Sequence, residues 1–121
     1  MKRFENQVVA VTGGAKGIGE ACAIRFAQEG AHIAILDVDD ALAKEVAEKC
    51  NELGADSKSW FLDVTDPEMV REVFKAILDE WGRLDVLVAS AGVYSGSPLE
   101  EVPLEQWQRT ININLTGTFL T

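Results

Sequence analysis

The chain has 121 residues, which suits one domain over residues 1–121, and its net charge of −9 disfavours attraction to nucleic acid or an anionic membrane. No apolar run approaches the roughly 18 residues of a membrane span, and none after the basic start is long enough for a signal peptide. The two cysteines, Cys22 and Cys50, have neither metal-binding nor redox spacing. We therefore expect a cytoplasmic protein with buried thiols, no metal site, and no nucleic-acid or membrane partner.

The first predicted unit is a strand, a glycine-rich turn and a helix. Val8–Thr12 is an apolar run with β-branched residues, and a helix is expected over Glu20–Glu29. Glycine adopts backbone angles that side chains forbid, and it lets a phosphate approach the peptide N–H groups. The N-terminus of the helix presents unpaired N–H donors to an anion. Gly13, Gly17 and Gly19 are therefore interpreted as a pyrophosphate cradle, with a plain tight loop as the alternative.

The next predicted strand, His32–Leu36, is apolar on both faces, as expected for a parallel strand covered by helices on both sides. It ends at Asp37, 20 positions after Gly17, where an acidic residue accepts hydrogen bonds from the adenosine ribose. This carboxylate would repel the 2′-phosphate of NADP by about 1 kcal/mol in water and about 4 kcal/mol at an effective dielectric of 20. Lys16 could instead reach that phosphate. We predict a dinucleotide site that favours NAD over NADP, the alternative being that Asp37 only caps the next helix.

The remaining elements alternate between helices and strands. We expect a helix over Ala41–Leu53, a strand over Ser59–Leu62, a helix from Asp66-Pro67 to Gly82, a strand over Asp85–Ala89 and a last helix over Leu104–Thr121. The last helix carries an apolar stripe, formed by Leu104, Trp107, Ile111, Leu115 and Phe119. Alternating strands and helices predict an α/β fold, a doubly wound parallel sheet with strand order 3-2-1-4.

Polar residues follow or end each of the four predicted strands. They are Thr12, Asp37, Asp63 and Ser90. Ligands of open α/β sheets bind in the crevice outside the carboxyl ends of the strands. This agreement supports a nucleotide site independently of any single motif.

Together these features resemble the N-terminal half of the classical short-chain dehydrogenase/reductase family. The turn Thr12-Gly13-x-x-x-Gly17-x-Gly19 is similar to the family's cofactor turn, and Asp63-Val64 is similar to its adenine-pocket pair. Ala89-Ser90-Ala91-Gly92 lies where the family has Asn-Asn-Ala-Gly, so only backbone contacts to the cofactor are expected there. Combined with the arguments above, the predicted cofactor contacts are Gly13, Lys16, Gly17, Ile18, Gly19, Asp37, Asp63, Val64, Ser90, Ala91 and Gly92.

The last helix also carries a family motif. Trp107 followed by Asn114-Leu115-x-Gly117-x-Phe119 resembles the helix that bears the family's catalytic asparagine. At about 100° per residue, Asn112 and Asn114 lie roughly 160° apart around a helix, so both cannot serve. The resemblance selects Asn114, and the alternative is a polar helix residue that bonds locally.

The resemblance implies NAD(P)-dependent hydride transfer between an alcohol and a ketone or aldehyde in the complete protein. In the family, a tyrosine exchanges the hydroxyl proton with help from a lysine four positions later, and a serine orients the substrate oxygen. Here the one tyrosine, Tyr94, is followed four positions later by Pro98, so that pair is absent. Ser95 and Ser97 precede Asn114, whereas the family serine follows the asparagine. Tyr94 is expected to line the cleft or pack on its loop.

We therefore interpret the chain as the cofactor-binding part of a longer dehydrogenase, with little turnover of its own and a small alcohol or carbonyl substrate in the complete protein. The fourth strand would be an apolar sheet edge, so we expect a homo-oligomer or aggregation through this edge or the last helix. Two alternatives remain. One is a non-catalytic dinucleotide-binding or regulatory module, complete as it stands. The other is a half-domain that needs a partner to supply the missing strands.

Overall fold

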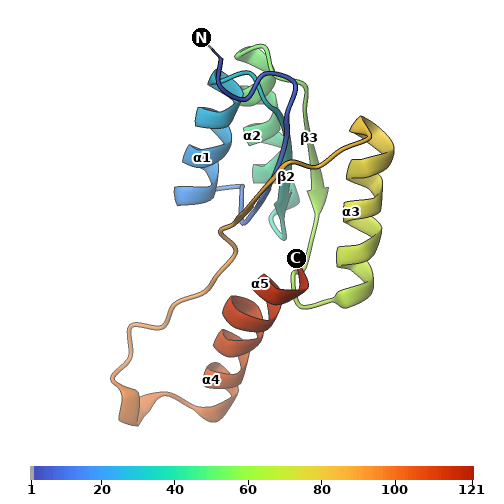
Figure 1. The fold of residues 1–121 in the computed structure, drawn as a ribbon. Coiled ribbons are helices and arrows are strands. Elements are labelled where there is room, and N and C mark those ends of the chain that lie inside the picture. Colours follow the sequence, from blue (N-terminus) through green and yellow to red (C-terminus); the bar gives the residue numbers. More distant parts are fainter. Residues whose placement is uncertain (1) are drawn as a thin grey trace.

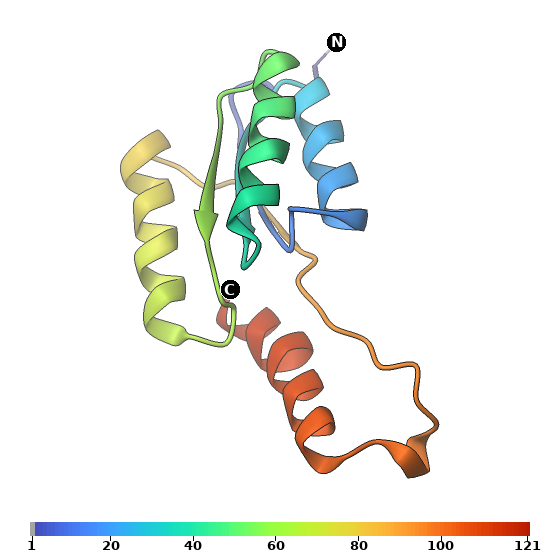
Figure 2. The same ribbon diagram turned by 180° about the vertical axis from the view of Figure 1, so that it is seen from behind.

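A computed structural model describes residues 2–121, which form a parallel sheet with helices on both faces (Figures 1 and 2). The strands are β1 (Val8–Thr12), β2 (His32–Asp37), β3 (Ser57–Phe61) and β4 (Val86–Ala89), in the order β3-β2-β1-β4. Helices α1 (Gly17–Gln28) and α2 (Asp40–Glu52) cover one face, and α3 (Pro67–Trp81) covers the other. The predicted α/β class and strand order are confirmed.

The two central strands are apolar on both faces because both faces are covered. All five residues of β1 are buried, and side chains alternate between the two sides of the sheet. One side packs with α1 and α2 through Val9, Val11, Ile33 and Ile35. The other side packs with α3 through Val8, Ala10, Ala34 and Leu36. The two cores hold the carboxyl ends of β1 and β2 side by side.

Helix α3 begins and ends where its sequence predicts. The carboxylate of Asp66 accepts the backbone N–H groups of Glu68 and Met69 at 3.1 Å each, and Pro67 occupies the first turn. Gly82 ends the helix in the left-handed conformation, with φ of +71°.

Two predicted elements begin more than one residue away from their predicted starts. Helix α1 begins at Gly17 rather than Glu20, because the last three residues of the glycine turn already form its first turn. Strand β3 covers Ser57–Phe61 rather than Ser59–Leu62. The Ser57 hydroxyl donates to the Ile33 carbonyl at 3.0 Å, which brings the polar start of β3 into the sheet.

The last predicted helix is interrupted and its apolar stripe is exposed. After a short 3₁₀ turn, η1 (Leu99–Glu101), the chain forms α4 (Leu104–Ile111), a π-helical segment η2 (Asn112–Thr116) and α5 (Gly117–Leu120). Leu115 is 65% exposed and Phe119 is 85% exposed, whereas Ile113 and Leu120 pack against the core beside α3. The predicted helix is present over Leu104–Leu120, but its middle turn, η2, is π-helical rather than α-helical. Helical periodicity groups side chains on one face without indicating what covers that face. Figure 1 shows α4 extending away from the sheet.

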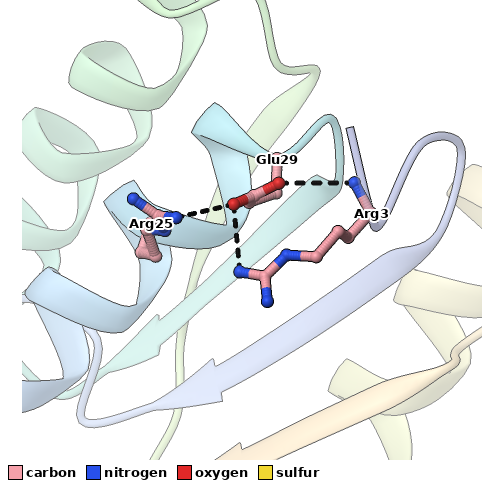
Figure 3. A network of polar contacts seen from close by, with 3 residues as sticks. All are labelled: Arg3, Arg25 and Glu29. Atoms are coloured by element: carbon pink, nitrogen blue, oxygen red, sulfur yellow. Dashed lines mark hydrogen bonds and ion pairs between the residues drawn. The ribbon is translucent and has the colours of Figure 1, made fainter. Parts of the chain in front are cut away.

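The segment before β1 is attached to the end of α1 by ionic contacts (Figure 3). The Glu29 carboxylate forms ion pairs with the guanidinium groups of Arg3 at 3.0 Å and Arg25 at 2.7 Å. It also accepts the backbone N–H of Arg3 at 3.3 Å. The hydrogen bonds from Arg3 hold the pKa of Glu29 below its usual value. Within residues 2–121, no helix is long and apolar enough to cross a membrane.

Candidate nucleotide-binding site

The glycine turn has backbone angles or close contacts that disfavour a side chain at Gly13, Gly17 and Gly19. Gly13 and Gly17 have φ of +62° and +59°, in the left-handed region. A β-carbon on Gly13 would lie 2.8 Å from the Ala91 backbone, and one on Gly19 would lie 2.1 Å from the Gly13 carbonyl oxygen. The turn therefore packs tightly between the loop after β4 and the first turn of α1, as a close backbone approach to a phosphate requires.

Asp37 ends β2 beside this turn and is buried, with 8% of the residue exposed. One oxygen, Oδ2, accepts the Ala15 N–H at 3.0 Å, and the other, Oδ1, accepts the Asp39 N–H at 2.9 Å. The cap of α2 is Asp39, whose carboxylate accepts the Leu42 N–H at 3.1 Å. The alternative that Asp37 caps that helix is therefore wrong.

Thr12 joins the end of β1 to the loop that follows β4. Its hydroxyl oxygen accepts the N–H groups of Ser90 at 3.1 Å and Ala91 at 3.2 Å. These bonds hold the backbone of Ser90-Ala91-Gly92 without the two asparagine side chains that the family pattern has at 89 and 90. The sequence predicted that Thr12 ends a strand, but it did not indicate that the Thr12 hydroxyl contacts this loop.

Asn114 holds the same loop further along. Its side-chain oxygen accepts the Val93 N–H, and its amide donates to the Val93 carbonyl, both at 2.8 Å. The alternative that Asn114 only bonds locally is wrong, because Val93 lies 21 positions away. Asn112 makes no such contact and lines the cleft instead.

Asp63 and Val64 form the wall next to β3. The Asp63 carboxylate accepts the backbone N–H and the hydroxyl of Thr65, at 2.9 and 2.7 Å, which shapes the loop before α3. Val64 is buried against Gly117, where a β-carbon would lie 2.5 Å from Val64 Cγ2. The glycine after the π segment thus allows the last helix to lie directly against this wall.

These elements surround one cleft of about 990 Å³ over the carboxyl ends of the strands. The predicted contacts that line it are Gly13, Lys16, Ile18, Asp37, Asp63, Val64, Ser90, Ala91 and Gly92. Gly17 and Gly19 lie in the first turn of α1 and do not line it. Tyr94 is 90% exposed and does not line the cleft, so the first of the two places expected for this side chain is wrong.

The cleft also has lining residues that sequence reasoning missed. Arg109 and Ile113 lie one helical turn apart on the segment that carries Asn114, and both face the cleft. The spacing of four residues predicts that the two side chains share one face of a helix. It does not indicate that this face borders the cleft, which depends on the position of the helix. Arg109 and Lys16 are the cleft's two basic residues, and neither has an ion pair within residues 2–121.

The model of the short chain dehydrogenase family matches residues 7–121. The chain belongs to this family.

Individual short-chain dehydrogenases are similar over nearly the whole chain. D-threitol dehydrogenase of Mycolicibacterium smegmatis is 41% identical, over 98% of this chain and 45% of its own length. The 3-oxoacyl-[acyl-carrier-protein] reductase FabG of Thermotoga maritima is 35% identical, over 97% of this chain and 48% of its own. The solved structure of NAD⁺-bound xylitol dehydrogenase is 34% identical, with a TM-score of 0.93 over 98% of this chain and 46% of that one. The chain thus spans about half the length of the relatives it matches.

Proposed function

We propose that the chain is the nucleotide-binding part of an NAD(P)-dependent oxidoreductase that interconverts an alcohol and a ketone or aldehyde. The observation that carries the proposal is the position of the glycine turn, which borders a cleft over the strand ends and has no room for a β-carbon at Gly13 or Gly19. Membership of the short-chain dehydrogenase family supports the reaction class.

In this proposal each part of the cleft holds one part of the cofactor. The N–H groups of the turn and of the first turn of α1 bind the diphosphate. Asp37 accepts the ribose hydroxyls, and Asp63 and Val64 border the adenine. The loop Ser90-Ala91-Gly92 contacts the nicotinamide side through its backbone. The nicotinamide, when bound, supplies or accepts the hydride at the substrate carbon.

Asn114 serves the reaction as a positioning residue. Both polar atoms of its side chain are engaged by the backbone of Val93. It therefore acts through the loop that it holds beside the cleft.

The favoured cofactor is NAD. The Asp37 carboxylate lies at the end of β2, where the ribose hydroxyls of NAD donate and a 2′-phosphate is repelled. A similar protein, xylitol dehydrogenase, has been solved with NAD⁺ bound. Lys16 is the one feature of the turn that favours NADP.

The chain also self-associates in this proposal, and it resides in the cytoplasm. Leu87 on the β4 edge and the stripe on α4 to α5 leave apolar side chains exposed. Cys22 and Cys50 are both free thiols, which fits a reducing compartment.

The test is a calorimetric titration of NAD into the wild-type chain and a Gly19→Ala variant. The added methyl group meets the Gly13 carbonyl oxygen, so the turn must move, and we expect the NAD affinity to fall by at least about tenfold. Gly96→Ala is the matched control, because the nearest atom to its β-carbon is 3.9 Å away. Circular dichroism confirms that each variant is folded. Wild-type protein that binds neither NAD nor NADP at millimolar concentration would overturn the proposal.

A further inference from the structure

Asp37 is bonded to the glycine turn itself, in addition to lying where a ribose would bind. Its Oδ2 accepts the Ala15 N–H at 3.0 Å, and this contact is buried. Within residues 2–121, Asp37 provides the one side chain that hydrogen-bonds to residues 13–16. Lys16, the N-cap of α1, has no side-chain cap bond of its own.

Backbone contacts alone hold the turn weakly at this point. The Gly14 N–H reaches the Leu36 carbonyl at 3.4 Å, near the limit for a hydrogen bond. The bond from Ala15 to Asp37 is shorter, and its acceptor is charged, which makes it the stronger of the two. The carboxylate is itself held in place, because its other oxygen accepts the Asp39 N–H at 2.9 Å.

We propose that Asp37 is a positioning residue for the diphosphate-binding turn, in addition to its role in ribose recognition; this inference rests on the proposed function. A carboxylate has about four acceptor sites, so two backbone N–H groups leave room for the ribose hydroxyls. The ribose and diphosphate subsites then share one side chain. Replacing Asp37 weakens diphosphate binding even when the nucleotide has no ribose hydroxyl to recognise.

A nucleotide without those hydroxyls separates the two roles. The probe is 2′,3′-dideoxyadenosine 5′-diphosphate, titrated calorimetrically into wild-type protein, Asp37→Ala and Asp37→Asn. Removing a negative charge by itself favours an anionic ligand, so charge and turn geometry predict opposite results. We expect about tenfold weaker binding to Asp37→Ala and a smaller loss for Asp37→Asn, which keeps one acceptor oxygen.

Asp79→Asn is the matched control. Asp79 pairs with Lys75 on α3, and it neither lines the cleft nor contacts the turn. Its substitution makes the same change in charge, and we expect it to leave the affinity for the dideoxy nucleotide unchanged or stronger. Unchanged or tighter binding in the folded Asp37 variants would overturn the inference.

Amide hydrogen exchange gives a second readout without any nucleotide. In Asp37→Asn, we expect the Gly14 and Ala15 amides to exchange faster relative to the core amide of Val9. Exchange equal to that of the wild type in both folded variants would overturn the inference, even if the dideoxy nucleotide binds too weakly to measure. Failure of the wild type to bind either NAD or NADP would instead overturn the proposed function, while the exchange result would still decide the role of Asp37.

Discussion

At the scale of single residues, the proposed preference for NAD depends on Asp37. In this proposal, a neutral residue at this position removes the repulsion of a 2′-phosphate and the carboxylate acceptor for the ribose hydroxyls. We expect Asp37→Ser to raise the affinity for NADP relative to NAD by about fivefold or more. We expect the absolute affinity for NAD to fall as well, because the turn loses the hydrogen bond from Ala15 to Asp37.

The measurement is the ratio of the two dissociation constants for wild type and variant, at one ionic strength. Lys16→Ala provides the complementary change. It removes a cation that lines the cleft, and we expect it to weaken NADP more than NAD. A ratio that does not move in Asp37→Ser would mean that this carboxylate does not read the ribose.

At the scale of elements, the π-helical segment and the loop after β4 are joined through Asn114. In Asn114→Ala, the backbone N–H and the carbonyl of Val93 each lose their hydrogen bond to the Asn114 side chain. We expect a loss of about 1–2 kcal/mol in the free energy of unfolding, measured with urea, because each such hydrogen bond contributes about 1 kcal/mol. Faster amide exchange at Val93 and weaker NAD binding should accompany it.

Asn112→Ala is the control for that experiment. It removes the same amide group from the same segment, but Asn112 makes no contact with Val93. We expect its free energy of unfolding to stay within about 0.5 kcal/mol of wild type. Equal effects of the two variants would argue against a specific clamp.

At the scale of the whole molecule, we expect the contacts of Asp85 to make the stability of the protein depend on pH. Its carboxylate bonds to Arg83 at 2.7 Å and accepts the Val8 N–H at the start of β1 at 2.8 Å. These contacts, with Arg83 first, hold the pKa of Asp85 below its usual value. A pKa lowered by folding stabilises the protein above the unfolded value of about 4, and this stabilisation is lost as the pH falls toward the folded value.

We therefore expect Asp85→Asn to lower the free energy of unfolding at pH 7. We also expect this free energy to fall less steeply than in the wild type as the pH is lowered below 5. Urea denaturation at several pH values measures this dependence. Glu72→Gln, on the exposed side of α3, is the control and should follow the wild-type curve. A variant with the same acid decline as wild type would show that other carboxylates govern it.

The exposed stripe on α4 to α5 has its own consequence at this scale. We expect the wild-type chain to associate in sedimentation velocity experiments, and Phe119→Glu to shift it toward monomer. A charge at a position that is already 85% exposed should not disturb folding. Gln108→Glu adds the same charge at an exposed position outside the stripe and is the control. A monodisperse wild-type monomer would contradict the expectation.

Local patterns of apolar residues predict much of this fold, because strands that are covered by helices on both faces of the sheet need apolar side chains on both faces. The doubly apolar β1 and β2 indicate central strands, and Asp66, Pro67 and Gly82 mark the ends of α3. The start of α1 is missed because glycine disfavours helices, whereas packing against Gly13 leaves room for nothing larger than glycine at position 19. The π segment has no comparable signature in the residues that form it.

The sequence by itself determined the class of fold and the turn that suits a diphosphate, since both leave local patterns of residue types, and the strand order, since alternating strands and helices follow general rules of connection. Only the tertiary structure decided which side of the last helix is covered, that Asn114 holds Val93, and that Asp37 holds the turn. Those contacts join residues 21 and 22 positions apart, whose distance is set by the packing of whole layers. Periodicity and spacing along the chain carry no measure of that distance.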